Sequence, residues 1–446
     1  MKHLSAGVRR GVSVAALAAA AGGWTAPAHA AAFYLADQST KGLGRAFSGE
    51  TAERGAQQQW YNPAAIGGIT GVQNYVGVTA ILPGGSVRPD ATSPTTVGRR
   101  VVGGAAGKDP VNNGYLPNGG VAIGLGKVAL GLTVTSPFSF TTNYDSDFFG
   151  RYSADKSRLR TFDIQPSIAF APNEHLSVGG AVNVEYLRAT LSNYLPDPFS
   201  TNLGTPATPF PDGHQYLKGD GWDVGYSFGF QYHNDQVDLG ASYKSSIRHK
   251  LKGKLIIDGL TDPLAGAINQ RVDGANADFT TPWQVSVGLR YHFTPAFTLN
   301  AQVTRFGWEK FDTIDLSNLG AVTPDQSIVQ SYKNSYTYAL GADYKLSEKT
   351  TLRAGVARDL TPIRDNYRDP RVPDGNRWFF AVGGTHELND FVGVDFGAAY
   401  DKIKSERVDN TAVIYGGTIL QTTSTTSGRT HNGHAVLLSL GAHVAM

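Results

Sequence analysis

Cysteine is absent from this sequence of 446 residues, and methionine occurs only twice. A chain without cysteine has no disulfide, no thiolate nucleophile and no cysteine-bound metal. No stretch reaches the ~20 consecutive apolar residues that a membrane-spanning helix needs. The formal net charge is only +2, and the chain has no basic run or base-stacking motif, so nothing here indicates nucleic-acid binding.

The first thirty residues have the pattern of a cleaved export signal. Three basic residues precede a short apolar core at 12–22, and Ala28-His29-Ala30 is a small-x-small cleavage pattern. We therefore expect an exported chain whose mature form begins at Ala31, with an uncleaved anchor as the alternative. The removed segment holds three basic and no acidic residues, so cleavage changes the formal net charge from +2 to −1.

Alternation of apolar and polar residues is the clearest pattern in the rest of the chain. In 222–233 the even positions are mostly aromatic or aliphatic and the odd positions small or polar, and 283–292, 392–401 and 436–446 alternate similarly. A period of two places each set on its own face of a strand. The 53 glycines and 20 tyrosines are typical of strands between two different solvents. A soluble β-sandwich would alternate in the same way, so the connections have to distinguish the two folds.

The connections favour a barrel, because seven long and six short ones alternate strictly between the expected strands. Long loops on one side and tight turns on the other are typical of outer-membrane barrels. We therefore predict an all-β fold, a 14-stranded antiparallel transmembrane β-barrel with both termini on the short-turn side. The strands are expected at 72–82, 119–127, 128–140, 158–170, 176–188, 222–232, 236–252, 276–292, 297–311, 332–346, 350–358, 376–388, 391–404 and 432–446.

The stretch 33–66 fits neither a helix nor a strand. It carries turn chemistry, with four glycines and an Asn62-Pro63 turn start, but it has too few apolar residues to bury a core of its own. We expect it to fold inside the barrel as a plug. The chain then divides into a signal peptide at 1–30, a hatch at 31–70 and a barrel at 71–446.

Two prolines fall within the expected strands, and each removes a donor from the hydrogen-bond ladder. For Pro137 we expect a kink that opens a gap in the wall. For Pro166 a kink and a bulge near the rim remain equal alternatives.

Several segments of the chain carry a family resemblance. They are AAFYLADQSTKGLGRAFSGE (31–50), the following NPA, VTSPFSFTTNY (134–144), YKNSYTYALGADY (332–344), RAGVARD (353–359) and IRDNYRDPRVPDGNRWFFAVGG (363–384). In these segments the mature chain resembles the FadL-type family of outer-membrane transport proteins, which carries long-chain fatty acids and, in its TodX-like branch, aromatic hydrocarbons. The positions that match the family's hatch motif are Gly42, Leu43, Gly44, Arg45, Ser48, Gly49, Glu50, Asn62, Pro63 and Ala64.

The resemblance implies a monomeric barrel in a Gram-negative outer membrane, with passive uptake of a hydrophobic small molecule. The ligand would be captured at the extracellular loops, passed to a lumen pocket and released sideways at a kink in the third strand, here Ser136-Pro137. The expected partners are lipopolysaccharide, outer-membrane lipid and the barrel-assembly machinery. Long-chain fatty acid is the expected cargo, and an aromatic hydrocarbon is the alternative.

A fatty-acid carboxylate needs a cation or a cluster of donors. Lys333 has inward parity near the loop end of its strand, opposite to Tyr332, and is one candidate. Arg188 is the other, although its outward parity also suits lipopolysaccharide phosphates. The expected apolar path, for which packing between hatch and wall is the alternative role, comprises Phe33, Leu35, Leu43, Phe47, Trp60 and Phe138.

The remaining charged and polar motif residues are expected to be structural. Asn62 should fix a turn of the hatch against the wall. Arg45 and Glu50 should pair with lumen-facing charges, because an unpaired buried charge is too costly. The candidate partners are Asp223, Asp395 and Arg290.

Two other classes of function are weaker alternatives. A membrane hydrolase would need a converging nucleophile and base, but His434 and Ser439 have opposite parity and no carboxylate partner is evident. A general diffusion porin would need an open lumen. GLGRAFSG lacks the Gly-Lys-Ser/Thr end of a phosphate loop, and no metal or redox motif is present, so we expect no enzyme and no cofactor.

Overall fold

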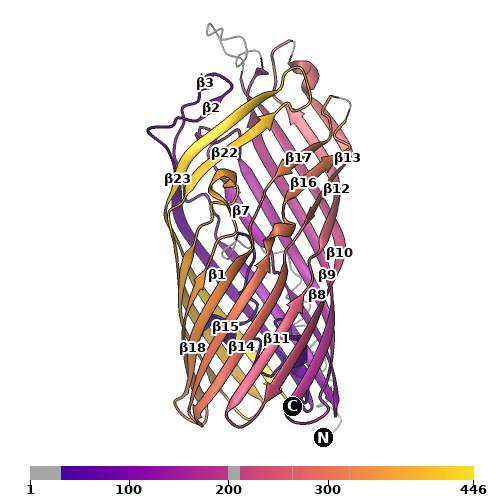
Figure 1. The fold of residues 1–446 in the computed structure, drawn as a ribbon, viewed down its shortest axis with the longest axis vertical. Coiled ribbons are helices and arrows are strands. Elements are labelled where there is room, and N and C mark those ends of the chain that lie inside the picture. The colour runs from indigo at the N-terminus through magenta and orange to yellow at the C-terminus, as the bar shows by residue number, and fades with distance from the viewer. Residues whose placement is uncertain (1–31, 199–210, 264, 321) are drawn as a thin grey trace, which may run out of the picture.

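A computed structural model describes residues 32–198, 211–263, 265–320 and 322–446. The chain forms a tall, closed 14-strand antiparallel barrel (Figure 1). β1 (Val72–Pro89) pairs with β23 (Thr422–Ala445) and so joins the first strand to the last. The predicted fold class is confirmed. The signal peptide expected at 1–30 lies outside the described residues.

The wall between β1 and β23 is built from strands that follow one another in the sequence, several of them in two pieces. They are β5 (Gly114–Leu125), β6 (Val128–Thr135) with β7 (Ser139–Asn143), β8 (Lys156–Phe170), β9 (Leu176–Leu195), β10 (Gly213–His233), β11 (Val237–Lys244) with β12 (Arg248–Asp258), β13 (Gln270–Thr280) with β14 (Trp283–Thr294), β15 (Phe297–Gly307) with β16 (Thr313–Ser317), β17 (Gln326–Val329) with β18 (Ser335–Lys345), β19 (Thr350–Asp359), β20 (Arg377–Glu387), and β21 (Val392–Ile403) with β22 (Arg407–Ile414).

The smaller elements lie in the loops and the lumen. The loop after β1 contains β2 (Thr96–Val97), β3 (Arg100–Val101) and β4 (Gly107–Lys108). The short helices are α2 (Thr40–Leu43), η1 (Pro63–Ile66), η2 (Gly266–Ile268), η3 (Trp308–Lys310) and η4 (Asp365–Tyr367). Within the described part of the chain, every helix is too short or too polar to cross a bilayer.

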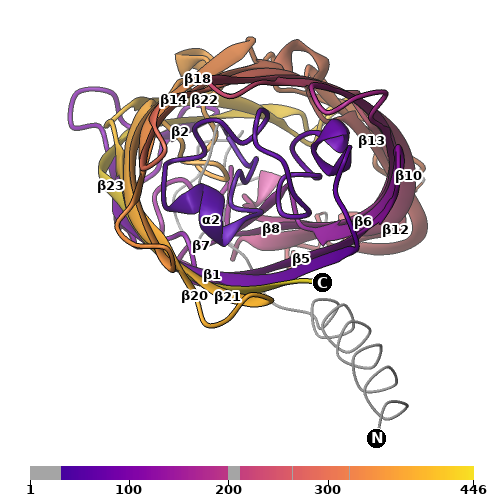
Figure 2. The ribbon, with the colours of Figure 1, turned by 90° about the horizontal axis from the view of Figure 1, so that it is seen from below.

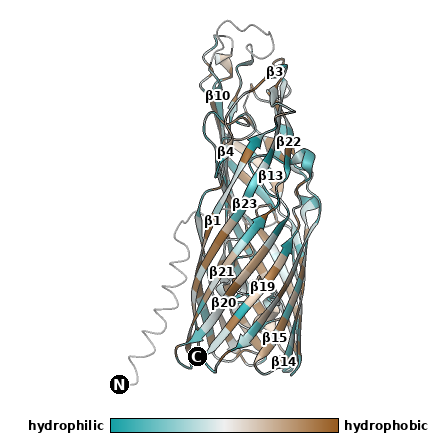
Figure 3. Ribbon diagram, turned by 90° about the vertical axis from the view of Figure 1, so that its left-hand side faces the viewer, coloured by the Kyte–Doolittle hydropathy of each residue, from teal (hydrophilic) through white to brown (hydrophobic). Residues whose placement is uncertain are grey.

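The apolar faces of the strands point away from the lumen. On β10, Trp222 is 58% exposed and Phe228 58%, whereas Ser227 and Gln231 are fully buried. Figure 3 shows apolar residues recurring along β1, β20, β21 and β23 in the lower part of the wall. An apolar exterior around a polar interior is the reverse of a soluble sandwich and matches a membrane barrel.

The short-turn ends of the predicted strands agree with the structure, but several long-loop ends are wrong. The strand expected at 222–232 begins at Gly213, and the one expected at 432–446 begins at Thr422. The single strand expected at 236–252 is divided into β11 and β12. The single strand expected at 276–292 is likewise divided into β13 and β14. Beyond the membrane both faces of a strand meet water, so the alternation that reveals a strand fades there.

Pro166 lies within β8 without displacing it. The pairing of β8 with β9 keeps one register from Ile164 to Ser167, and Pro166 stands opposite Leu132 on β6. The bulge considered for Pro166 is therefore wrong, because a bulge would shift the register. The kink stays a prediction.

Residues 32–70 lie inside the barrel and wind across the lumen (Figure 2). Almost all side chains from Phe33 to Ile66 are buried. α2 packs against β20, β21 and β23, and η1 packs against β8, β9 and β10. Residues 32–70 are called the luminal segment below.

Candidate functional site

The luminal segment meets the wall where the third barrel strand is interrupted, between β6 and β7. Leu35 N donates a hydrogen bond to Pro137 O at 2.7 Å. Ser139 N donates to Phe33 O at 3.0 Å, and Tyr34 forms a bridge to Phe138. Residues 33–35 therefore pair with the interrupted strand as a short extra strand on its lumen side.

The ladder between the second and third barrel strands ends beside this interruption. Residues 114–118 of β5 pair with β1, whereas the pairing of β5 with β6 begins only at Gly119. On the lumen side Gln38 closes the gap, because its side chain donates to Ser136 O at 3.0 Å and accepts from Ser136 N at 3.1 Å. A small cavity lies in the gap, lined by Tyr115, Leu116, Pro117, Ser136, Ser139, Arg160, Thr161 and Phe162. We call this place the wall gap.

Phe33 lies at the centre of an aromatic cluster in the lumen. Its ring centroid is 5.0 Å from that of Trp308 and 5.2 Å from that of Phe311. Phe138 and Phe140, from the interrupted strand, lie at 5.8 and 5.9 Å. Pairs of this kind are worth about 0.5–1.5 kcal/mol each beyond area burial. Phe33 therefore holds the start of the luminal segment between the third strand and the end of β15.

A first cavity, the lumen cavity, has a volume of about 80 Å³ and lies between the luminal segment and β11, β14, β15, β18, β19 and β20. Its lining from the luminal segment is Tyr34, Ala36, Asp37, Ala46, Phe47, Trp60 and Tyr61. The wall contributes small and polar side chains together with Lys244 and Arg377. The lining is mainly apolar, and its charged members are two cations, Lys244 and Arg377, and two acids, Asp37 and Asp359.

These two cations differ in their partners. Arg377 is surrounded by acids, with Asp401 at 3.0 Å, Asp359 at 3.6 Å and a contact to Asp374. Lys244 donates to Gln165 Oε1 at 3.0 Å and lies 4.0 Å from the centroid of the Trp60 ring. Among the described residues no carboxylate lies within ion-pair distance of Lys244, which makes it the available cation of this cavity.

A second cavity, the outer cavity, lies on the other side of Phe33 and has a volume of about 70 Å³. Most of its lining is apolar: Phe33, Phe140, Leu159, Leu191, Leu217, Leu251, Phe279, Phe311, Ile314, Ile328, Tyr332 and Val372. Its charged groups are Asp369 and Arg371, which pair at 2.7 Å. The Nε of Arg371 is buried without a hydrogen-bond partner in the described part of the chain.

The outer cavity adjoins a groove of about 740 Å³ between the long loops. The two share Ile328, Gln330, Asp369 and Arg371. The groove also exposes apolar side chains, with Val413 54% exposed and Ile419 fully exposed. Apolar surface therefore runs from the loops through the outer cavity to Phe33, and the adjacent Tyr34 lines the lumen cavity.

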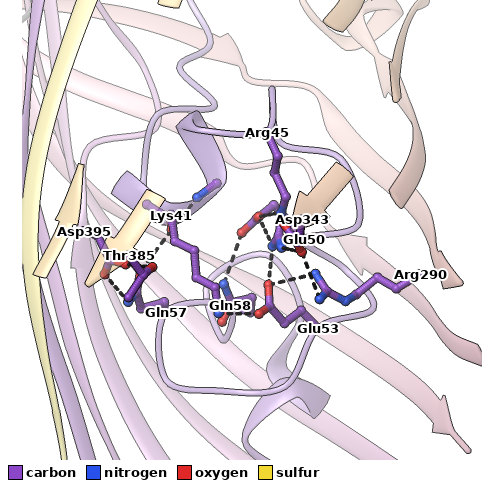
Figure 4. Close-up of polar contacts among 12 residues, drawn as sticks. Lys41, Arg45, Glu50, Glu53, Gln57, Gln58, Arg290, Asp343, Thr385 and Asp395 are labelled. Carbon is purple, nitrogen blue, oxygen red and sulfur yellow. Dashed lines mark hydrogen bonds and ion pairs between the residues drawn. The ribbon is translucent and has the colours of Figure 1, made fainter. Parts of the chain in front are cut away.

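A charge network fixes the luminal segment to the wall below the lumen cavity (Figure 4). Arg45 is fully buried and contacts Glu50 and Glu53 within the segment and Asp343 on β18 at 3.1 Å. Arg290 on β14 contacts Glu53 at 3.2 Å and Asp343 at 3.0 Å. Three carboxylates are thus held by cations from both the segment and the wall, which stabilises one position of the segment.

The partners that the sequence predicted for Arg45 and Glu50 are correct only in part. Arg290 joins the network through Glu53, and Asp395 holds the segment through Gln57, whose amide donates to it at 2.8 Å (Figure 4). Asp223 belongs elsewhere, because it lies 3.4 Å from the His249 ring. Its position on the long-loop half of β10 is too far along the wall to meet α2.

Asn62 caps η1 and connects it to the wall. Its side-chain oxygen accepts from Ala64 N at 3.0 Å, and its amide donates to Thr51 O at 2.7 Å and Phe230 O at 3.1 Å. Pro63 occupies the first position of the helix, where its fixed φ suits the turn. The NPA sequence therefore serves as a structural anchor between the segment and β10.

The remaining motif residues pack close to the wall. A Cβ on Gly44 would lie 3.0 Å from Gly383 Cα, so the two glycines let α2 approach β20. Gly49 has a φ of +71° next to Arg290. Gly42 faces the Glu50 carboxylate, and Ser48 donates to Arg45 O at 2.8 Å.

The structure separates the predicted ligand residues into two groups. Phe33 lines the outer cavity, and Phe47 and Trp60 line the lumen cavity. Phe138 lies in the aromatic cluster, while Leu35 and Leu43 are buried with Ile81 and Leu437 between segment and wall. Leu35 and Leu43 therefore pack rather than line either cavity.

The parity prediction for Lys333 is wrong. Residues 330–334 lie between β17 and β18, so the alternation of β18 does not extend to them. Lys333 is exposed, and it is Tyr332 that points inward, with its ring 5.0 Å from Phe311. Arg188 is exposed on the outer face of β9, in agreement with its parity, and so lies outside both cavities.

Sequence reasoning missed the two cations of the cavities, Lys244 and Arg371. Both had a usable signal. In VDLGASYK the positions of Gly240, Ser242 and Lys244 form the polar face, which places that lysine in the lumen. Arg371 stands within the segment 363–384 that carries the family resemblance.

His434 and Ser439 have separate partners. Ser439 bonds to Thr40 and Thr79 at 2.8 and 2.9 Å, and the His434 ring bonds to Asn432 O at 2.8 Å. The two side chains therefore do not form a nucleophile–base pair.

Comparison with known proteins matches this architecture. The family model described as outer membrane protein transport protein (OMPP1/FadL/TodX) matches residues 21–445. Outer membrane protein P1 of Haemophilus influenzae is 29% identical over 458 residues, covering 95% of this chain and 96% of that protein. The long-chain fatty acid transport protein of Escherichia coli (strain K12) is 24% identical over 434 residues, covering 88% and 93%. The crystal structure of a Pseudomonas aeruginosa FadL homologue superimposes with a TM-score of 0.81 at 24% identity, covering 93% and 99%.

Proposed function

The chain belongs to the OMPP1/FadL/TodX family, transporters of hydrophobic compounds in the Gram-negative outer membrane, and we propose that it carries long-chain fatty acids. The observation that carries this proposal is the position of Phe33 and Tyr34. These two adjacent residues line different cavities, and their backbone is bonded to the interrupted third strand beside the wall gap. The cleaved signal, the monomeric state and insertion by the barrel-assembly machinery stay predictions.

In the proposed path a ligand first enters the groove between the long loops. It then passes Ile328 and Arg371 into the outer cavity, where burial of each CH₂ group contributes about 0.8 kcal/mol. Withdrawal of Phe33 and Tyr34 joins this cavity to the lumen cavity. An acyl chain can make this passage without meeting bulk water, which suits a passive process.

Release takes place sideways through the wall gap. The luminal segment closes the gap with the bonds from Leu35 to Pro137 and from Gln38 to Ser136. When residues 33–38 move, these bonds break, and residues 114–118 of β5, which precede its ladder with β6, border an opening from lumen to bilayer. A hydrophobic ligand then leaves directly into the membrane.

Lys244 supplies the group that distinguishes an acid from a neutral hydrocarbon. A charge-assisted hydrogen bond to a carboxylate is worth roughly 1.5–3 kcal/mol, or on the order of tenfold or more in affinity. The lumen cavity is otherwise mainly apolar, and its other cation, Arg377, is already paired with acids.

The test is binding of oleate and methyl oleate by the purified protein, measured by native mass spectrometry. We expect both to bind, and we expect Lys244→Gln to weaken oleate at least tenfold while leaving methyl oleate unchanged. Lys345→Gln, an exposed lysine at the end of β18, is the matched control. Saturable binding of toluene without oleate would replace the fatty acid by the hydrocarbon. The transport path would be contradicted if oleate, methyl oleate and toluene all failed to bind. A large steady ion current in a planar bilayer would contradict it as well.

A further inference from the structure

Two rows of basic residues cross the outer face of the wall on β8, β9, β10 and β12, which lie side by side (Figure 1). In the first row Arg160, Arg188, Asp220 and Lys252 are successive cross-strand partners. The second row is one step closer to the long loops and contains Arg158, Thr190, Lys218 and Lys254. The six basic residues of these rows are called the basic wall patch.

The patch faces away from the lumen. On the same strands the intervening residues Leu159, Leu187, Leu217 and Leu251 are buried, and three of them line the outer cavity. Since successive side chains of a strand point to opposite faces, the basic residues face outward. Of the six, only Arg160 lines the wall gap, and the other five lie apart from the transport path.

An aromatic row directly below places the patch relative to the membrane. Phe162, Tyr186 and Trp222 are the next cross-strand partners toward the short-turn end. Tyr186 and Trp222 pack at 5.1 Å, and Trp222 is 58% exposed. Aromatic rings on barrel exteriors mark the membrane interface. The first basic row is two residues higher, about 7 Å, which is the level of lipid headgroups.

The patch keeps an excess of positive charge, because Asp220, opposite Arg188 and Lys252, is the one carboxylate within its two rows. In the described part of the chain none of its six residues has a carboxylate within 4.0 Å, and Arg160 stands directly opposite Arg188. Like charges directly opposite one another are unfavourable. The Nε of Arg158 and the Nε and Nη2 of Arg160 are buried without hydrogen-bond partners among the described residues. This arrangement needs an anion rich in acceptor oxygens.

We propose that the basic wall patch binds the phosphate groups of a phosphorylated glycolipid in the outer leaflet. Guanidinium groups match the oxygens of phosphate with paired hydrogen bonds, and lysines add positive charge. The aromatic row lies where the acyl chains of the same lipid begin. A lipid phosphate is concentrated at this level by the membrane itself, whereas a free anion is not.

The test is binding of bisphosphorylated lipid A and of its dephosphorylated form to the full-length protein, measured by native mass spectrometry. The variant Arg188→Gln/Lys252→Gln removes two cations of the first row, neither of which lines the wall gap or a cavity. Each basic residue near an anionic lipid surface corresponds to about a fivefold change in affinity, so we expect a loss on the order of tenfold or more. Lys345→Gln/Lys349→Gln removes the same charge at the short-turn end and should leave binding unchanged.

Heat-modifiable migration on gels shows whether the variants are folded. If the double variant does not fold, the single variant Lys252→Gln replaces it. Oleate binding should be unchanged in every folded variant, which separates this proposal from the transport path. Equal binding of both lipid forms, or equal binding by the variant, would overturn the proposal. Binding of inorganic phosphate without binding of lipid A would overturn it as well.

Discussion

Arg45 is the residue whose loss most directly tests how the luminal segment is held. Its guanidinium group has no exposed area and contacts Glu50, Glu53 and Asp343. Arg45→Met keeps much of the volume but leaves Glu50, also fully buried, without an ion-pair partner among the described residues. Breaking a buried pair in this way costs about 3–5 kcal/mol. The strands of the barrel keep their own ladder, so the cost falls on the segment.

The assay is hydrogen exchange of peptides from residues 40–60, with barrel peptides as internal reference. For local opening of the segment, a cost of 3–5 kcal/mol corresponds to exchange that is faster by roughly 10²-fold to 5 × 10³-fold. Glu50→Gln should have a smaller effect, because Arg45 keeps Glu53 and Asp343. In the double variant Arg45→Met/Glu50→Gln the segment should exchange more slowly than in Arg45→Met alone, because no unpaired carboxylate remains at position 50.

The reasoning is refuted if Arg45→Met leaves exchange of the segment unchanged, or if Glu50→Gln is the more damaging of the two. Equal acceleration of segment and barrel peptides would show that the segment and the wall open as one unit. Ion conductance gives an independent readout, because a loosened segment should admit brief current steps that the parent protein lacks.

Gly383→Ala should displace both α2 and the neighbouring strand β21, because the new Cβ would lie 2.7 Å from Gly44 Cα and 2.5 Å from Phe396 O. We expect a loss of about 1–3 kcal/mol in segment stability. Gly103→Ala, with open space around it, should have little effect in the same exchange measurement. Asn62→Ala removes the cap of η1 and two bonds to backbone oxygens, which should cost at least about 1 kcal/mol. Asn62→Asp keeps the acceptor and should be milder, and equal effects of the two variants on thermal unfolding would contradict a capping role.

The membrane-spanning half of the barrel could be predicted from the sequence because each strand there separates two solvents. Trp222 and Phe228 face lipid, while Ser227 and Gln231 face the lumen, so the chemistry alternates with the pleat. The same rule fails in the long-loop half. There Lys218 and Asp220 face an aqueous or headgroup layer, and the inward side of the wall is the apolar outer cavity, so the expected contrast is weak or reversed.

The candidate site shows the same division. Phe33, Phe47 and Trp60 were predicted from the hatch resemblance and do line the two cavities. Lys333 was assigned by extending the parity of β18 across residues that are not in a strand, and the inward position belongs to Tyr332. The alternation of inward and outward side chains holds only within a continuous strand. It does not extend across residues 330–334, which separate β17 from β18.

The sequence by itself determined the strand alternation, the order of long and short connections and the hatch motif, because these depend on the local backbone period and on which solvent each face meets. Only the tertiary structure decided that Lys244 and Arg371 are the cations of two cavities separated by Phe33 and Tyr34. It also decided that Arg160 faces Arg188 across two strands. These are contacts between residues far apart in the chain, and they depend on strand register and on the path of the luminal segment, neither of which has a local signature.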